Sequence, residues 1–228
     1  MNRLPVELSF WAIPPFVSLL TLFGLAGLAL IKGRGQKINL LLSAICILGG
    51  LLSLDKALAS VLTDPALVLR ISRIDHAFVV FFIPVYLHFT YAFLKMTRQR
   101  WVVVIAYAFS GCLSLFTQGE YYIAGVTQYF FGYYARGGPL IYGFGAASTL
   151  SVVFCLYLLF RGLDQEQDPD RKNKIKYIIL GLGMAALLAQ FDLLPLAGIA
   201  SYPLGNLVFI PMFILGFAVL KHDLLDLG

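Results

Sequence analysis

Residues 10–61 read FWAIPPFVSLLTLFGLAGLALIKGRGQKINLLLSAICILGGLLSLDKALASV. Two apolar runs, residues 10–31 and 38–61, flank a short basic segment that contains Lys32, Arg34 and Lys37. An α-helix crosses the hydrocarbon core of a bilayer with about 20 apolar residues, so each run is long enough to span a membrane. This stretch therefore predicts two membrane-spanning helices joined by a basic loop.

The same alternation of apolar and polar stretches continues to the end of the chain. Hydrophobic residues make up 60% of the sequence and charged residues 13%, which is more apolar than a soluble domain of this length usually is. We therefore expect an all-α, polytopic membrane protein in which residues 1–228 form a single seven-transmembrane helix bundle. The five further spans are predicted at about residues 75–94, 101–116, 139–160, 175–195 and 204–220.

Basic residues fall mainly in every second connecting segment. Of the Lys and Arg residues, 12 lie in segments predicted to be cytoplasmic and 5 in segments predicted to be outside. Short cytoplasmic loops of membrane proteins carry such an excess, so we expect the N-terminus outside and the C-terminus in the cytoplasm. The net charge of +5 follows this bias beside hydrophobic spans and does not indicate nucleic-acid binding.

Three connecting segments have distinct compositions. Thr63-Asp64-Pro65 is a helix-stop and turn signal, and it predicts an outer loop over residues 62–74. Residues 117–138 are rich in Tyr, Phe and Gly, which favours a loop at the outer membrane interface. Residues 164–174 carry mixed charge, which is typical of a solvated cytoplasmic connector.

Polar residues inside the predicted spans are candidates for ligand binding, because ionisable groups in hydrocarbon are costly and usually face the bundle interior. They map to the outer thirds of their helices, which predicts an outward-facing polar pocket with Arg136 and the aromatic loop as a lid. The alternative is that these residues lie at wet helix ends and pair locally. The candidates are Asp55, Asp75, His76, Gln190, Asp192 and Asn206, with Lys56 beside the first of them.

Metal and cofactor chemistry is not predicted. Cys46, Cys112 and Cys155 fall in separate spans without the paired spacing of zinc or iron–sulfur ligands. His76 and His88 are about 18 Å apart along one helix, so they cannot ligate one haem together. We therefore expect no metal site and no cofactor.

Catalytic motifs are not recognised either. The chain shows no Gly-x-Ser-x-Gly elbow, no phosphate loop and no histidine-rich box, so we expect that it is not an enzyme. A retinal protein is also excluded, because the only lysine of the last span, Lys221, stands at its cytoplasmic end.

The chain resembles the N-terminal seven-transmembrane sensor region of bacterial histidine kinases and related diguanylate cyclases. The resemblance covers nearly the whole chain in the expected order. It is carried by Arg73-Ile74-Asp75-His76, Pro84-Val85-Tyr86-Leu87-His88-Phe89, Tyr133-Tyr134-Ala135-Arg136-Gly137-Gly138-Pro139-Leu140, Lys174-Ile175-Lys176-Tyr177-Ile178-Ile179-Leu180-Gly181, Tyr202-Pro203-Leu204-Gly205-Asn206 and Ala218-Val219-Leu220-Lys221-His222-Asp223-Leu224-Leu225-Asp226.

This resemblance implies a receptor in the bacterial inner membrane that senses a small-molecule or lipid ligand. It also implies that the last helix passes the signal to a cytoplasmic output domain, absent from this chain, or to a partner protein, and that the module can act as a homodimer. The output residues would be Lys221, His222, Asp223 and Asp226. The alternative function is a small-solute carrier or permease, which would use the same outer cavity.

Overall fold

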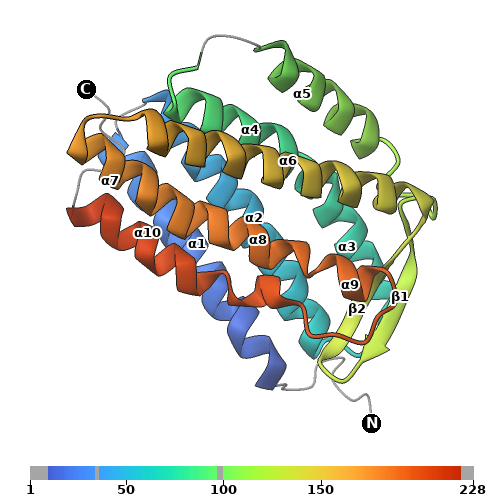
Figure 1. Ribbon diagram of the computed structural model, residues 1–228. Coiled ribbons are helices and arrows are strands. Elements are labelled where there is room, and N and C mark those ends of the chain that lie inside the picture. Colours follow the sequence, from blue (N-terminus) through green and yellow to red (C-terminus); the bar gives the residue numbers. More distant parts are fainter. Residues whose placement is uncertain (1–9, 34–35, 97–99, 222–228) are drawn as a thin grey trace.

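The first two helices of the bundle form a long antiparallel hairpin (Figure 1). The computed structural model describes residues 10–33, 36–96 and 100–221. After a 3₁₀ turn at Phe10–Ala12, α1 spans Ile13–Gly33 and α2 spans Lys37–Val61, close to the predicted bounds. Gly50 of α2 allows close packing, because a Cβ atom there would lie 3.0 Å from the Phe23 ring of α1.

The third predicted span is two helices, α3 (Pro65–Val79) and α4 (Phe82–Phe93). Pro84 explains the break: it has no N–H to donate to the carbonyl of Val80, and the Ser110 hydroxyl donates to that carbonyl instead, at 2.7 Å. The predicted outer loop over residues 62–74 is wrong for most of its length. Helix α2 ends at Val61, and Asp64 already caps α3 by accepting a hydrogen bond from the Ala66 N–H at 2.9 Å.

Helix α5 (Trp101–Ser114) supplies Ser110 and lies at the edge of the bundle (Figure 1). Its 14 residues extend about 21 Å, which is less than the roughly 30 Å of hydrocarbon in a bilayer. By length, this helix alone is therefore short for a span.

The aromatic segment after α5 forms a β-hairpin rather than an irregular loop. Strands β1 (Ile123–Tyr129) and β2 (Gly132–Gly137) pair antiparallel, so the bundle is helical with one added two-stranded sheet. The turn places Gly132 at φ 121°, and a Cβ atom there would lie 2.6 Å from the Cα of Ser60. The hairpin is thus pressed against the end of α2.

The second half of the chain begins with α6 (Pro139–Gln165), followed by α7 (Pro169–Ile178). The predicted solvated connector over residues 164–174 is wrong in extent, because α6 continues to Gln165 and Asp168 caps α7 by accepting from the Asp170 N–H. The chain continues through a π-helical turn, Ile179–Gly183, into α8 (Met184–Gln190) and the short α9 (Leu193–Leu196). A 3₁₀ turn, Leu204–Leu207, then leads into α10 (Phe209–Lys221).

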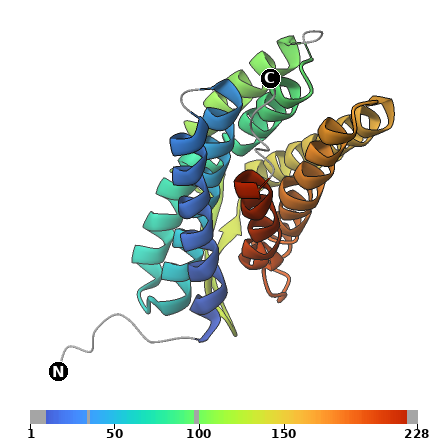
Figure 2. The same cartoon turned by 90° about the vertical axis from the view of Figure 1, so that its left-hand side faces the viewer.

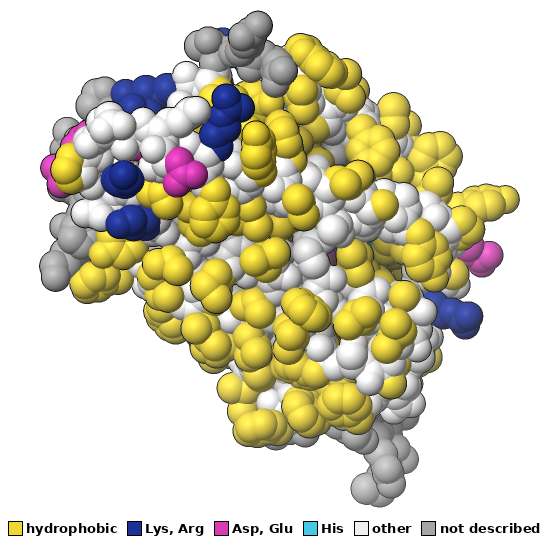
Figure 3. All heavy atoms as spheres, in the orientation of Figure 1, with side chains coloured by type: hydrophobic (Ala, Val, Ile, Leu, Met, Phe, Trp, Pro, Cys, Tyr) yellow, Lys and Arg dark blue, Asp and Glu magenta, His cyan; other side chains and the backbone are white. Residues whose placement is uncertain are grey.

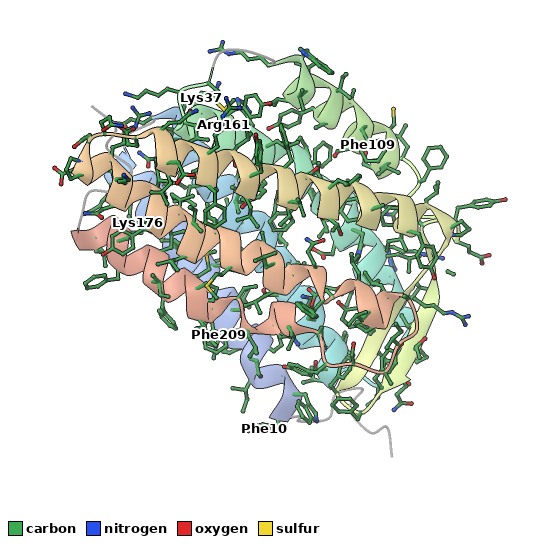
Figure 4. The ribbon with its side chains drawn as sticks, viewed as in Figure 1. Phe10, Lys37, Phe109, Arg161, Lys176 and Phe209 are labelled. Carbon is green, nitrogen blue, oxygen red and sulfur yellow. The ribbon has the colours of Figure 1, made fainter. Side chains whose placement is uncertain are left out.

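The helices form two groups. Figure 2 shows α1 to α4 on one side and α6 to α10 on the other, with the hairpin between them at one end. Apolar side chains cover most of the surface in Figure 3, and the charged side chains gather at the end where α6 and α7 meet. Figure 4 labels Lys37, Arg161 and Lys176 toward that same end, opposite the hairpin.

Within the described part of the chain, four helical segments are long and apolar enough to cross a membrane: Phe10–Lys32, Lys37–Val61, Pro139–Gln165 and Pro169–Leu196. A charged end and an apolar belt agree with a membrane-embedded bundle. The helical membrane fold is therefore confirmed, while the count of seven spans and their orientation stay predictions.

Candidate functional site

A cavity of about 170 Å³ lies between the two groups of helices. Its walls are mostly apolar and come from α1, α2, α4, α6, α8 and α10, including Leu22, Ile45, Phe82, Val152 and Met212. Its polar lining includes Ser53, Asp55, Lys56, Ser72, His76, Tyr134, Ser148, Ser151, Gln190 and Asp192. A cavity with apolar walls and a few polar groups is the usual form of a small-ligand site.

An ion pair joins the two groups of helices at this cavity. The Lys56 ammonium of α2 contacts the carboxylate of Asp192, and both residues are only 6% exposed. The other carboxylate oxygen of Asp192 accepts a hydrogen bond from the Gly205 N–H at 2.9 Å. Asp192 can contact Lys56 and the Gly205 N–H together because it lies in the break between α8 and α9. It therefore connects α2 to the turn that precedes α10.

A second polar group connects α2 to α3. The Ser72 hydroxyl donates to the Asp55 carboxylate at 2.8 Å, and the ring Nδ1 of His76 lies 2.8 Å from the Ser72 carbonyl oxygen. Ser72 and His76 stand four residues apart, so both occupy one face of α3. Asp75, the neighbour of His76, is also buried and lies close to Asp55.

The other predicted site residues have different positions. Gln190 lines the cavity, and its side-chain oxygen accepts from the Thr149 hydroxyl at 2.9 Å. Asn206 is buried beside the cavity, and its backbone carbonyl accepts from the Ser18 hydroxyl of α1 at 2.7 Å. Arg136 is exposed on the hairpin, whereas its neighbours Tyr134 and Ala135 line the cavity.

Most of the predicted site residues are buried. They are Asp55, Asp75, His76, Asp192 and Asn206. The structure brings Asp55, His76, Gln190 and Asp192 to one cavity, with Lys56 among them.

Sequence analysis did not identify Ser72 and Tyr134 as site residues. The four-residue spacing of Ser72 and His76 is a usable signal once residues 65–74 are recognised as helix. Tyr134 had no such signal, because the hairpin decides which aromatic faces inward. Burial, with the negative charges of Asp192 and Asp55 nearby, raises the pKa of the Tyr134 phenol well above its usual value, so the hydroxyl keeps its proton.

At the end of the bundle away from the hairpin, side-chain hydrogen bonds join α1 to α10. The Lys32 ammonium donates to the carbonyl oxygens of Val219 and Leu220 at 3.3 and 3.2 Å. Of the predicted output residues, Lys221 ends α10, and His222, Asp223 and Asp226 lie outside the described residues.

These observations define a helical protein of membrane type with a partly polar cavity between two groups of helices. Residues 14–228 match the family described as the N-terminal 7TM region of histidine kinase, and the chain belongs to this family. Membership confirms the predicted resemblance and makes the chain a membrane sensory module of the histidine-kinase type. No curated protein and no solved structure matches the chain.

Proposed function

We propose that the chain is the sensor of a bacterial two-component system in the inner membrane, with seven spans, the N-terminus outside and the C-terminus in the cytoplasm. A small molecule or lipid binds in the cavity, and α10 passes the change to a cytoplasmic kinase. Asp55, Asp75, His76, Gln190, Asp192 and Asn206 form or support the binding site in this proposal. Arg136 and the aromatic hairpin serve as a lid in this proposal, because the neighbours Tyr134 and Ala135 line the cavity.

The observation that carries this proposal is the contact chain from Lys56 through Asp192 to the Gly205 N–H. It runs from a cavity wall in the first group of helices to the turn that starts the last helical segment. A ligand that competes for Lys56 or Asp192 would alter the position of this turn. Two direct contacts therefore link the cavity to the turn that precedes α10.

The free-energy difference that a ligand has to supply to switch the sensor is modest. A ligand shifts a two-state equilibrium only by its difference in affinity for the two states, and a coupling of about 1–3 kcal/mol is typical. Loss of one charge-assisted hydrogen bond is worth about 1.5–3 kcal/mol. A rearrangement of the Asp192 contacts alone would therefore supply a free energy of this size.

The ligand chemistry follows from the cavity. Apolar walls favour a hydrocarbon or aromatic body, and the polar groups favour a head group that can accept from Lys56 or donate to Asp192. A volume of about 170 Å³ fits a small organic molecule or one end of a lipid chain.

The test measures autophosphorylation of the kinase together with this sensor in proteoliposomes, whether the two are encoded as one chain or two. Lys56→Gln removes the buried charge, and Lys37→Gln removes an exposed charge from the same helix as a matched control. We expect Lys56→Gln to change the basal phosphorylation level several-fold and Lys37→Gln to leave it unchanged.

Two outcomes would count against the sensor proposal. Equal phosphorylation in the wild type and in folded Lys56→Gln would break the link between the ion pair and output. Solute uptake by proteoliposomes that Lys56→Gln abolishes, without an effect on phosphorylation, would favour the carrier alternative.

Dimerisation is the remaining part of the proposal. Histidine kinases act as dimers, and α5 presents an apolar, outward-facing surface at the edge of the bundle, including Trp101, Val104 and Ile105. Cysteine cross-linking at Val104 in native membranes would give a dimer band if this surface pairs, and none if it faces lipid only.

A further inference from the structure

Asp55, Asp75 and His76 form a cluster that the ion pair does not use. One ligand-type atom from each, a carboxylate oxygen or a ring nitrogen, lies within 4.8 Å of the others. Asp55 comes from α2, and the other two come from α3. All three are buried, with Asp75 only 8% exposed.

The lysine nearest to this cluster is shared with a third carboxylate. Lys56 follows Asp55 directly, and its ammonium contacts Asp192. One lysine thus faces three buried carboxylates, Asp55, Asp75 and Asp192. Asp55 is held by the Ser72 hydroxyl, a neutral donor. Buried carboxylates require a proton, a cationic partner or a metal ion, because an isolated charge is strongly disfavoured away from water.

The Asp75 carboxylate gives a second reason to expect a bound ligand. Among the residues that the structure describes, its buried Oδ2 atom has no hydrogen-bond partner. Buried polar atoms are nearly always paired, so an unpartnered carboxylate oxygen beside two other potential ligands needs an explanation. A bound cation would supply the missing partner.

His76 is arranged as metal-ligating histidines usually are. Its Nδ1 lies 2.8 Å from the Ser72 carbonyl, which only accepts, so Nδ1 carries the hydrogen and Nε2 keeps its lone pair. A ligating histidine typically donates its other ring N–H to a carbonyl or a carboxylate. Ser72 thus orients His76 through its carbonyl and Asp55 through its hydroxyl.

We propose that Asp55, Asp75 and His76 bind a divalent first-row transition-metal ion, such as Zn²⁺, Mn²⁺ or Fe²⁺. The mixed nitrogen and oxygen donors favour these ions over Ca²⁺ and Mg²⁺, which take oxygen ligands. Tetrahedral ligands at roughly 2.1 Å from one ion lie about 3.4 Å apart, so the cluster has to contract by up to about 1.4 Å. The expectation of no metal site is thereby revised.

The bound ion would join α2 to α3 beside the cavity. The Asp55 and His76 side chains line the cavity, so the ion can keep an open position for water or for a ligand. This metal-site proposal does not rest on the sensor function, because metal binding is measured without any kinase.

The experiment uses the full chain purified in detergent, treated with EDTA and then dialysed. It measures binding of Zn²⁺ and Mn²⁺ by calorimetry, metal content by mass spectrometry, and the visible absorption of added Co²⁺, which reports a nitrogen ligand. The wild type is expected to bind one ion per chain in the presence of excess Mg²⁺. A wild type that binds none of the three ions at a saturable site overturns the proposal.

Variants locate the ion. Asp75→Asn and His76→Gln are expected to weaken binding at least as much as the loss of an outer-shell partner, about 10–100-fold, and Ser72→Ala by about that amount. Asp164→Asn, which changes an exposed carboxylate near the end of α6, is the matched control and should bind like the wild type. Wild-type affinity in folded Asp75→Asn and His76→Gln would place the ion elsewhere and overturn the assignment.

Discussion

The α1–α2 hairpin and the segment from α7 to α10 have similar lengths of chain but very different regularity. The first consists of two uninterrupted helices, Ile13–Gly33 and Lys37–Val61. The second contains a π-helical turn, a break at Phe191 and Asp192, an irregular stretch and a 3₁₀ turn. The cavity lies between them, and the contact chain from the cavity to the turn before α10 runs from Lys56 of α2 to Asp192 and Gly205 of the irregular segment.

The two regions thus differ in how their backbone hydrogen-bonding groups are satisfied. A broken helix in a membrane must have its free backbone groups satisfied by protein, because lipid offers no hydrogen bonds. The Gly205 N–H obtains such a partner from Asp192. π-Helical turns are often found at functional sites, so the irregular segment is the natural place for a conformational change.

The largest expected effect comes from breaking the ion pair that joins the two regions. Lys56→Met leaves the Asp192 charge buried without its cation and should lower the free energy of unfolding by about 3–5 kcal/mol. Thermal unfolding of the detergent-solubilised protein measures this loss. The double variant Lys56→Met with Asp192→Asn should recover part of it, and full additivity of the two single losses would show that the pair does not interact.

The sequence predicted the regular region well and the irregular region poorly. Long apolar runs bounded by basic residues gave α1 and α2 to within a few residues, because hydropathy alone specifies such helices. Hydropathy could not place the break at Asp192, since the Asp192 carboxylate is held by Lys56 and by the Gly205 N–H, which belong to other helical segments. Depth along each helix did group the buried site residues, but the pairing of Lys56 with Asp192 rather than Asp55 needs the tertiary structure.

A glycine substitution in each region sharpens the comparison. A Cβ atom at Gly205 would lie 2.7 Å from the Asp192 Cγ atom, so Gly205→Ala should lower stability by about 1–3 kcal/mol and shift basal signalling. At Gly27, in α1, a Cβ atom meets nothing within 4 Å, and Gly27→Ala should be neutral or stabilising by up to about 1 kcal/mol. Thermal unfolding measures both changes. Equal destabilisation by the two would contradict the close packing of Gly205 against Asp192.

A smaller effect is expected where a single neutral hydrogen bond joins the regions. Ser18→Ala removes the bond from α1 to the Asn206 carbonyl and should lower stability by about 0.6–1 kcal/mol. Ser114→Ala removes a hydroxyl that bonds within its own helix, to the Gly111 carbonyl, and serves as the control. A drop in melting temperature for Ser18→Ala that does not exceed that of the control would mean that this bond does not hold α1 to the irregular segment.

The smallest effect is expected on the hairpin surface. Arg136 is exposed, so Arg136→Gln should change stability by less than about 0.5 kcal/mol. Gly132→Ala, in the same hairpin, forces a side chain toward the Ser60 backbone at a positive φ and should cost more. Comparison of their melting temperatures shows whether the hairpin stabilises the bundle by the fit of its backbone to α2 or by the charge of Arg136.

The two bonds from Lys32 to Val219 and Leu220 have a mechanical consequence. The last carbonyls of a helix are normally satisfied by water or by a cap, and here a side chain from the first helix holds them. The end of α10 is therefore fastened to α1 at the charged face of the bundle. A shift of the C-terminal end of α10 is expected to move the end of α1 with it, because the Lys32 ammonium bonds to both carbonyls.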